Sequence, residues 1–328
     1  MSDPTQGQQT YEASPPPAPA LSPRIWEILV CPQCGGTLSD SAAGVICEHC
    51  RRKVDRTPAG QLDLRLTRPK RYTLELTLEP ALGAENGRGG PGADAAENEV
   101  DWRPLPPNPR PEVRVGKVKG GCHLPRDVRT YFPAARGPGA MALDLGCGTQ
   151  VHKEVCQLAG FEYVGLDYSA PEAMMLGDAQ ALPFRGDSFE LVLSIAVLEH
   201  VRFPLLMLRE AYRVLKPGGL LLGSVAFLEP FHLNSMHHHT HLGTFHGLRF
   251  AGFEVEHVAP CRGWTGLVAQ AQMGLFPGAP RWLARTLVSP VLGLHRLWWQ
   301  IGRRSDPNAS ELKRMTKNSG AFLFLARK

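Results

Sequence analysis

Two Cys-x-x-Cys pairs near the start of the chain carry the clearest chemical signal. They read CPQC, from Cys31 to Cys34, and CEHC, from Cys47 to Cys50, with twelve residues between them. Four thiolates in two such knuckles can hold a tetrahedral zinc ion. A redox pair is a weaker alternative, because the motif occurs twice and lies outside a thioredoxin-like unit. We expect a structural zinc site that staples residues 23–66, a segment too short to hold a core alone.

A glycine turn follows the apolar run that begins at Met141, in MALDLGCGTQ. Gly146 and Gly148 let the main chain approach a ligand closely. Dinucleotides, phosphates and S-adenosylmethionine all suit such a turn. A Walker lysine is missing, and Val151 stands where a dinucleotide turn would have its third glycine, so the first two ligand types are disfavoured.

Acidic residues follow the next two apolar runs. Asp167 ends the run in YVGLDYS, where a carboxylate can accept hydrogen bonds from both ribose hydroxyls. Asp178, in GDAQALPF, ends a third run and could receive an adenine amino group. Asp144 precedes the glycines on the first run. These positions favour a nucleoside-containing ligand over a bare phosphate.

The elements that must position these groups are short apolar strands alternating with amphipathic helices. The pattern predicts an α/β fold with a doubly wound parallel sheet covered on both faces. The chain has 328 residues, 43% of them apolar and 20% charged, with a net charge of +5. A mildly basic chain of this size allows nucleic acid or an anionic membrane surface as partner and requires neither.

Residues 140–258 resemble a class I S-adenosylmethionine-dependent methyltransferase. The matching segments are LDLGCGTQ, VGLDYS, GDAQALPF, DSFELVLSIAVLEHV, REAYRVLKPGG and AGFEVEHV, in the usual order and spacing. The resemblance implies a seven-stranded Rossmann-like sheet with a reversed final hairpin. It also implies a set of cofactor-binding residues: Asp144, Gly146, Cys147, Gly148, Asp167, Tyr168, Asp178, Ala179 and Ser194.

One residue departs from the family pattern. Gln150 stands where the family usually has glycine. Its side chain could crowd the methionine part of the cofactor or point away, and we expect binding to survive. A chain in which Gln150 blocks the donor would instead be a non-catalytic, zinc-dependent scaffold that activates a partner.

The segment with the four cysteines resembles the small zinc-ribbon proteins that activate tRNA, rRNA and protein methyltransferases. It resembles more loosely the ribbon of some bacterial rRNA guanine methyltransferases. An RNA methyltransferase that grips its substrate with the ribbon is therefore an alternative function. That alternative needs the basic residues beside the second knuckle, Arg51, Arg52, Lys53 and Arg56, to bind RNA instead of forming a solvated edge.

Histidines cluster after the fifth strand, in the segment that lies over the methyl donor in this fold. A metal site is one interpretation, because His237 and His241 could share a helical face. A general base is another, and a polar wall of the acceptor pocket is the third and the one we favour. His200, just beyond the fourth strand, and His232 are the best candidates for acid–base catalysis. The cluster comprises His232, His237, His238, His239, His241 and His246.

The segment 261–320 is too long for a hairpin connection and must form an element of its own. RWLARTLVSPVLGLHRLWWQIGRR places arginines along one stripe of a helix that is otherwise apolar. Pro290 and Gly293 should bend or split that helix. Such a helix is typical of a cap over an acceptor pocket, the interpretation we favour, or of an interface with lipid.

The sequence thus predicts a disordered tail (1–22), a zinc ribbon (23–66), a linker and lead-in (67–121) with an exposed strand at 71–80, and a methyltransferase domain (122–328) whose cap is 261–320. No secretory signal and no membrane span are found, so we expect a cytoplasmic protein, peripheral at the membrane if the helix binds lipid. The predicted activity is methyl transfer from S-adenosylmethionine to a small or lipid-like acceptor.

Overall fold

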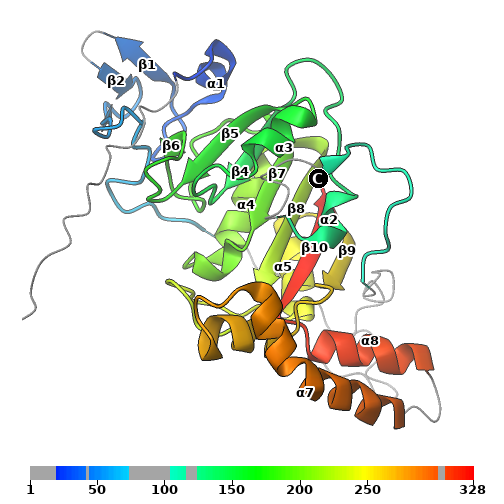
Figure 1. The fold of residues 1–328 in the computed structure, drawn as a ribbon. Coiled ribbons are helices and arrows are strands. Elements are labelled where there is room, and N and C mark those ends of the chain that lie inside the picture. Colours follow the sequence, from blue (N-terminus) through cyan, green and yellow to red (C-terminus); the bar gives the residue numbers. More distant parts are fainter. Residues whose placement is uncertain (1–19, 42–43, 74–103, 116–123, 302–306) are drawn as a thin grey trace, which may run out of the picture.

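The protein consists of a small cysteine-containing ribbon, a seven-stranded sheet with its helices, and a helical insertion (Figure 1). The structure, a computed structural model, describes residues 20–41, 44–73, 104–115, 124–301 and 307–328. Most of the predicted strand at 71–80 and nearly all of the predicted tail lie outside these residues.

The large sheet has the strand order β6-β5-β4-β7-β8-β10-β9. The first five strands in this order run parallel, and β10 is antiparallel to both of its neighbours. This confirms the predicted seven-stranded sheet with a reversed final hairpin. The strands are β4 (Met141–Leu145), β5 (Glu162–Asp167), β6 (Met175–Leu176), β7 (Phe189–Ile195), β8 (Leu215–Ala226), β9 (Glu254–Pro260) and β10 (Ala321–Arg327).

Helices cover the sheet, and the core lies between them and the strands. All five residues of β4 are buried, as expected of a central parallel strand covered on both faces. Helix α4 (Pro204–Val214) begins with proline, which suits a first helical turn, and buries one stripe that contains Met207 and Val214. The other covering helices are α2 (Arg126–Arg129), α3 (Lys153–Leu158), the short η5 (Leu198–His200) and α5 (His241–Ala251).

The N-terminal ribbon comprises α1 (Pro23–Ile28), β1 (Leu38–Ser41), β2 (Gly44–Cys47) and β3 (Lys53–Val54). Its three strands form an antiparallel sheet. The chain that leaves it pairs with the edge of the large sheet: Leu176 N–H donates to the carbonyl of Leu62, and Leu64 N–H donates to the carbonyl of Leu176. The ribbon therefore covers the exposed edge at β6 (Figure 1).

The segment 104–115, expected to be part of a linker, packs on the core of the large sheet. Leu105, Val113 and Val115 are buried. Asn108 adds a hydrogen bond from its side-chain amide to the carbonyl of Thr130, at 3.0 Å. These residues belong structurally to the sheet domain.

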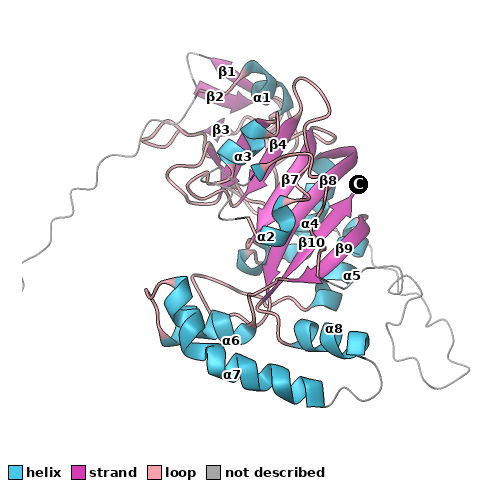
Figure 2. Ribbon diagram, turned by 45° about the vertical axis from the view of Figure 1, so that its right-hand side comes forward, coloured by secondary structure: helices cyan, strands magenta, loops and turns pink. Residues whose placement is uncertain are grey.

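The insertion before β10 forms α6 (Gly266–Ala269), η6 (Gln270–Leu275), α7 (Arg281–Ile301) and α8 (Pro307–Lys317), grouped at one end of the sheet (Figure 2). Helix α7 is not split at Pro290. Proline cannot donate to the carbonyl of Thr286 one turn earlier, and the hydroxyl of Ser289 donates to that carbonyl instead, at 2.7 Å. Among the described helices, none combines the length and apolar character needed to cross a membrane.

Candidate active site

The glycine turn connects β4 to α3 at the carboxyl edge of the sheet. Gly146 and Gly148 have φ angles of 62° and 49°, which favour glycine. A Cβ on Gly146 would lie 2.8 Å from a methyl group of Val197, whereas a Cβ on Gly148 would meet nothing within 4 Å. The turn is therefore closed on the side of Val197 and open beside Gly148.

Gln150 adopts the conformation that a glycine would take at the end of this turn. Its φ is 58°, in the left-handed region. Its side-chain amide donates a hydrogen bond to the carbonyl of Glu172, in the loop after β5. The backbone thus keeps the shape of a glycine turn, and the glutamine side chain is tied to a neighbouring loop.

Asp144 lies behind the turn and is only 1% exposed. Its carboxylate accepts a hydrogen bond from the Tyr163 hydroxyl at 2.9 Å and lies 3.2 Å from Nδ1 of His152. Burial and the Asp144 charge raise the pKa of Tyr163. Cys147 is also buried, and burial raises the pKa of its thiol. Both predicted cofactor residues have side chains packed inside the protein, so their main chain is what the turn exposes.

Asp167 joins the turn to the next strand. Its carboxylate accepts hydrogen bonds from the N–H groups of Gly148 at 3.0 Å and of Ser169 and Ala170 at 2.9 Å. The Gly177 N–H donates to the main-chain carbonyl of Asp167, which brings Asp178 to the same edge. Three predicted positions, Gly148, Asp167 and Asp178, therefore lie close together at this edge of the sheet.

The other residues predicted to bind S-adenosylmethionine lie in or beside the neighbouring strands. Asp178 accepts hydrogen bonds from the main-chain and side-chain amides of Gln180 at 2.8 and 3.0 Å. Tyr168 is 61% exposed, and Ala179 is half-buried against the core. Ser194, next to Leu145 in the sheet register, is fully buried, and its hydroxyl has no hydrogen-bond partner among the described residues.

His200 and His232, the two predicted acid–base residues, are brought together. Their rings meet edge to face, with centroids 5.2 Å apart. His200 belongs to η5, just after β7, and His232 to the loop after β8. Burial, and then the neighbouring His232, lower the pKa of His200.

Glu199 completes this group and was not identified in the sequence analysis. It is 0% exposed, and neither carboxylate oxygen makes a hydrogen bond within the described part of the chain. Burial raises the pKa of Glu199 to about 7. The signal that could have found it is an acid in the otherwise apolar sequence IAVLEHV, directly after a buried strand.

The other histidines do not form the predicted His237–His241 pair on a helical face. Helix α5 begins at His241, capped by the Thr240 hydroxyl, so His237 lies outside it. His237 packs against His239, with ring centroids 5.8 Å apart, whereas His241 packs on Phe322. The interpretation in which His237 and His241 share a helical face therefore does not hold, because α5 starts later than the spacing suggested.

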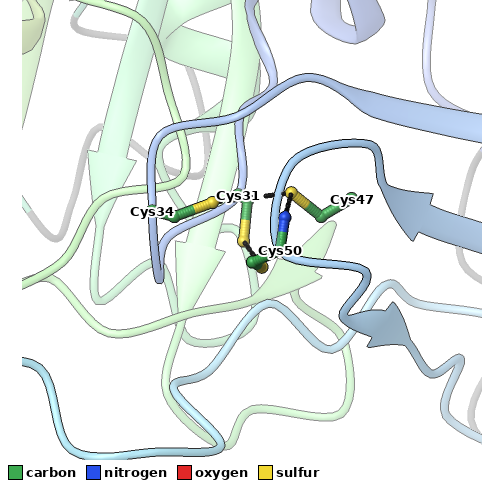
Figure 3. Close-up of side chains that lie close together, drawn as sticks. All are labelled: Cys31, Cys34, Cys47 and Cys50. Atoms are coloured by element: carbon green, nitrogen blue, oxygen red, sulfur yellow. Dashed lines mark hydrogen bonds between the residues drawn. The ribbon is translucent and has the colours of Figure 1, made fainter.

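The four cysteines of the ribbon converge from two loops (Figure 3). Their sulfur atoms all lie within 4.8 Å of one another. Sγ of Cys31 lies 3.7 Å from that of Cys50, and Sγ of Cys34 lies 3.5 Å from that of Cys47. A tetrahedral zinc site with Zn–S bonds of about 2.3 Å has sulfurs about 3.8 Å apart. The donor set and spacing therefore fit a structural zinc ion.

Comparisons with known proteins agree with this fold. Residues 143–223 match the family described as "Methyltransferase domain". A ubiquinone biosynthesis O-methyltransferase of Ruegeria pomeroyi is 35% identical over 120 residues, covering 32% of this chain and 47% of that protein. A demethylmenaquinone methyltransferase of Renibacterium salmoninarum is 38% identical over 96 residues, covering 26% and 40%. The chain thus spans about half the length of the curated relatives it matches.

Solved structures of methyltransferases resemble the chain more distantly. One chain in the solved complex of the Haloferax volcanii Trm112 methyltransferase activator with a methyltransferase is 19% identical to this chain. The match has a TM-score of 0.41 and covers 64% of this chain and 88% of the chain in the complex. An S-adenosylmethionine-dependent methyltransferase of Mesorhizobium loti is 20% identical, with a TM-score of 0.38, covering 61% and 95%. Residues 143–223 therefore match a methyltransferase domain, and the strand order and the glycine turn agree with that match.

Proposed function

We propose that the protein transfers the methyl group of S-adenosylmethionine to a small, lipid-like acceptor. The observation that carries the proposal is the opening beside Gly148, where a Cβ would meet nothing within 4 Å and where the carboxylate of Asp167 lies 3.0 Å from the turn. When bound, S-adenosylmethionine supplies an electrophilic methyl group on its sulfonium sulfur.

The residues around this opening have distinct roles in the proposal. The main chain from Gly146 to Gly148 holds the amino-acid part of the donor, and Asp144 keeps the turn in shape through Tyr163 and His152. The carboxylate of Asp167 binds the ribose hydroxyls, with Tyr168 beside it. Asp178 and Ala179 border the adenine. The hydroxyl of Ser194 is buried and has no hydrogen-bond partner among the described residues, which leaves it available to the cofactor in this proposal.

In this proposal, the methyl acceptor binds beside η5 and the loop after β8. His200 and His232 stand there as candidates to take a proton from an acceptor hydroxyl. The same loop exposes Phe231 and Leu233 at 75% and 81%. Exposed apolar side chains beside the site favour an acceptor with an apolar body.

The RNA alternative is weakened by the ribbon itself. Arg52 is only 6% exposed, and its guanidinium donates to the main-chain carbonyls of Asp63 and Arg65. Arg56 pairs with Asp40 at 3.2 Å. Two of the four basic residues that an RNA site would use therefore have structural partners.

Helix α7 suggests how the protein reaches a lipid-like acceptor. It carries three arginines, Arg281, Arg285 and Arg296, and no acidic residue. Arginine beside exposed tryptophan and leucine is the composition of a helix that lies on an anionic lipid surface. Its apolar side chains that are more than half exposed are Trp282, Val291, Leu294, Leu297, Trp298 and Ile301.

Calorimetric titration of the zinc-loaded full chain with S-adenosylhomocysteine tests the donor site. We expect micromolar binding that weakens about 10- to 100-fold in Asp167→Ala, because two hydrogen bonds to a charged group are lost. Glu172→Ala, an exposed acid in the same loop, is the matched control. An absence of heat with the fold intact would overturn the proposal.

Cosedimentation with vesicles tests the lipid surface. We expect binding to vesicles that contain anionic lipid, reduced at least tenfold in Leu294→Glu and unchanged in Leu158→Glu, an equally apolar exposed position on α3. Binding that is equal for both variants, or a dimer that buries α7, would exclude the lipid role.

A further inference from the structure

We infer that Glu199, His200 and His232 form a binding site for a divalent transition metal ion, distinct from the zinc ribbon. We call these three residues the histidine–glutamate cluster. One ligand atom from each lies within 4.8 Å of the other two. A zinc-like ion with bonds of about 2.1 Å would draw the three atoms to about 3.4 Å from one another. Two imidazoles and one carboxylate are a ligand set that such ions accept while keeping an open position.

The unpaired carboxylate of Glu199 is the strongest indication of a missing ligand. The side chain is 0% exposed, and neither of its oxygens has a hydrogen-bond partner in the described part of the chain. The amides of Glu199 and Ala226 lie near the carboxylate without reaching hydrogen-bond geometry. A buried polar group without a partner is costly. A cation between Glu199 and the two histidines would remove that cost.

The main chain holds the three residues together although they come from separate segments. The N–H groups of Met236 and His237 both donate to the carbonyl of Glu199, at 2.6 and 3.2 Å. These bonds fasten the loop that carries His232 to the short helix that carries Glu199 and His200. The cluster is therefore part of the folded framework and does not depend on one flexible side chain.

The surroundings of His232 suit a metal ligand. Its Nδ1 lies 3.0 Å from the carbonyl of Pro230, which can accept a hydrogen bond only if Nδ1 carries the proton. That tautomer leaves the lone pair on Nε2 free for a metal. The carboxylate of Glu229 lies 3.9 Å from the same Nδ1 and accepts a hydrogen bond from the Trp264 indole. A carboxylate behind a ligating imidazole is a common outer partner in metal sites.

The cluster adjoins the proposed donor site. Val197, two residues before Glu199, has the methyl group that closes the space above Gly146. An ion held by the cluster would thus lie at the same edge of the sheet and could bind an oxygen of the acceptor at its open position. This role rests on the proposed function and would replace proton transfer by His200 and His232, whose lone pairs the metal would take. Metal binding itself does not depend on the proposed function. The role favours acceptors with a hydroxyl or carboxylate oxygen.

Titration with Co²⁺ tests the site, using untagged protein whose ribbon already holds zinc. We expect one equivalent of Co²⁺ to bind with visible d–d absorption and without the thiolate charge-transfer band that the cysteine site would give. Affinity should fall at least 10- to 100-fold in Glu199→Gln and in His200→Ala. His238→Ala, an exposed histidine of the same loop, is the control and should bind normally.

The outcomes separate this inference from the proposed function. Absence of the one Co²⁺ equivalent, or unchanged affinity in both Glu199→Gln and His200→Ala, would overturn the metal site. S-adenosylhomocysteine titrated into the same preparation reports the donor site independently. If S-adenosylhomocysteine binds and Co²⁺ does not, only the inferred metal site is refuted. If Co²⁺ binds and S-adenosylhomocysteine does not, only the proposed function is refuted. Unfolding curves establish that the variants fold.

Discussion

The cysteine cluster of the ribbon and the histidine–glutamate cluster of the sheet domain differ in how the chain assembles them. The four cysteines come from two knuckles within one short segment, and their spacing alone predicted a site. Glu199 lies in η5, after β7, and His232 lies in the loop after β8, so only the fold brings them together. The first would supply four protein ligands and close the metal site, while the second would supply three and leave a position open. A closed site supports a fold, and an open one can take part in chemistry.

The largest effect is expected from breaking the closed site. Cys34→Ser removes one of the four thiolates that would hold the zinc ion. Structural zinc contributes on the order of 10 kcal/mol to folding of such modules, so residues 23–66 should lose their protection against amide hydrogen exchange. The sheet domain should keep its own. Unchanged protection of the ribbon in Cys34→Ser would contradict a structural zinc site.

A chelator should distinguish the two clusters by the order of metal loss. Three nitrogen and oxygen ligands with an open position hold an ion less firmly than four thiolates in a folded ribbon. We expect a metal-loaded protein treated with EDTA to lose the ion of the histidine–glutamate cluster first, followed by zinc. Metal content measured against time shows the order, and simultaneous release would mean that the clusters are not independent.

Breaking the contact between the ribbon and the sheet domain is expected to have an intermediate effect on the stability of the protein. Gln61 is 3% exposed, and its side-chain amide donates to the carbonyls of Ala170 and Ala173 at 3.2 and 2.5 Å. Gln61→Ala removes both hydrogen bonds, although the carbonyl of Ala170 still accepts from the N–H of Ala173. The loss should lower the free energy of unfolding by about 1–3 kcal/mol. Chemical denaturation measures the change. Ser39→Ala, which removes a hydrogen bond to the carbonyl of Ile46 within the ribbon alone, is the comparison.

A smaller effect is expected at Arg65, where the ribbon touches the proposed donor site. Its guanidinium lies 5.6 Å from the ring centroid of Tyr168 and pairs with Asp63 at 2.5 Å. Loss of the cation–π contact in Arg65→Ala should weaken S-adenosylhomocysteine binding about two- to fivefold. The control is Arg71→Ala, an exposed arginine further along the chain. If Arg65→Ala binds S-adenosylhomocysteine as tightly as the unchanged protein, the ribbon does not contribute to the proposed donor site.

The smallest effect is expected at Gln150. Gln150→Gly relieves the left-handed backbone conformation and removes the hydrogen bond to Glu172, and these changes oppose each other. Affinity for S-adenosylhomocysteine should stay within about twofold. A large gain in affinity would show that the glutamine side chain obstructs the donor.

The strands could be predicted because each has a local signature. The apolar run of β4, the glycine turn and Asp167 are readable from neighbours in the sequence, and the strand order followed from the resemblance. The partners of individual side chains could not be predicted from the sequence. Arg52 looked like a solvated basic residue until the fold placed the carbonyl of Arg65 beside it. Glu199 went unnoticed because its significance depends on burial and on His232, which lies in another loop.

The pairing of Leu62 and Leu64 with Leu176 also constrains the order of folding. During synthesis the ribbon emerges first, and zinc can fold it as soon as Cys50 is available. Residues 62–64 can pair with Leu176 only after β6 is made and the sheet has formed, since contacts between residues far apart in the chain form late. We therefore expect a nascent chain in which the ribbon is folded but undocked, with Leu62 and Leu64, both buried in the finished protein, open to chaperones until β6 arrives.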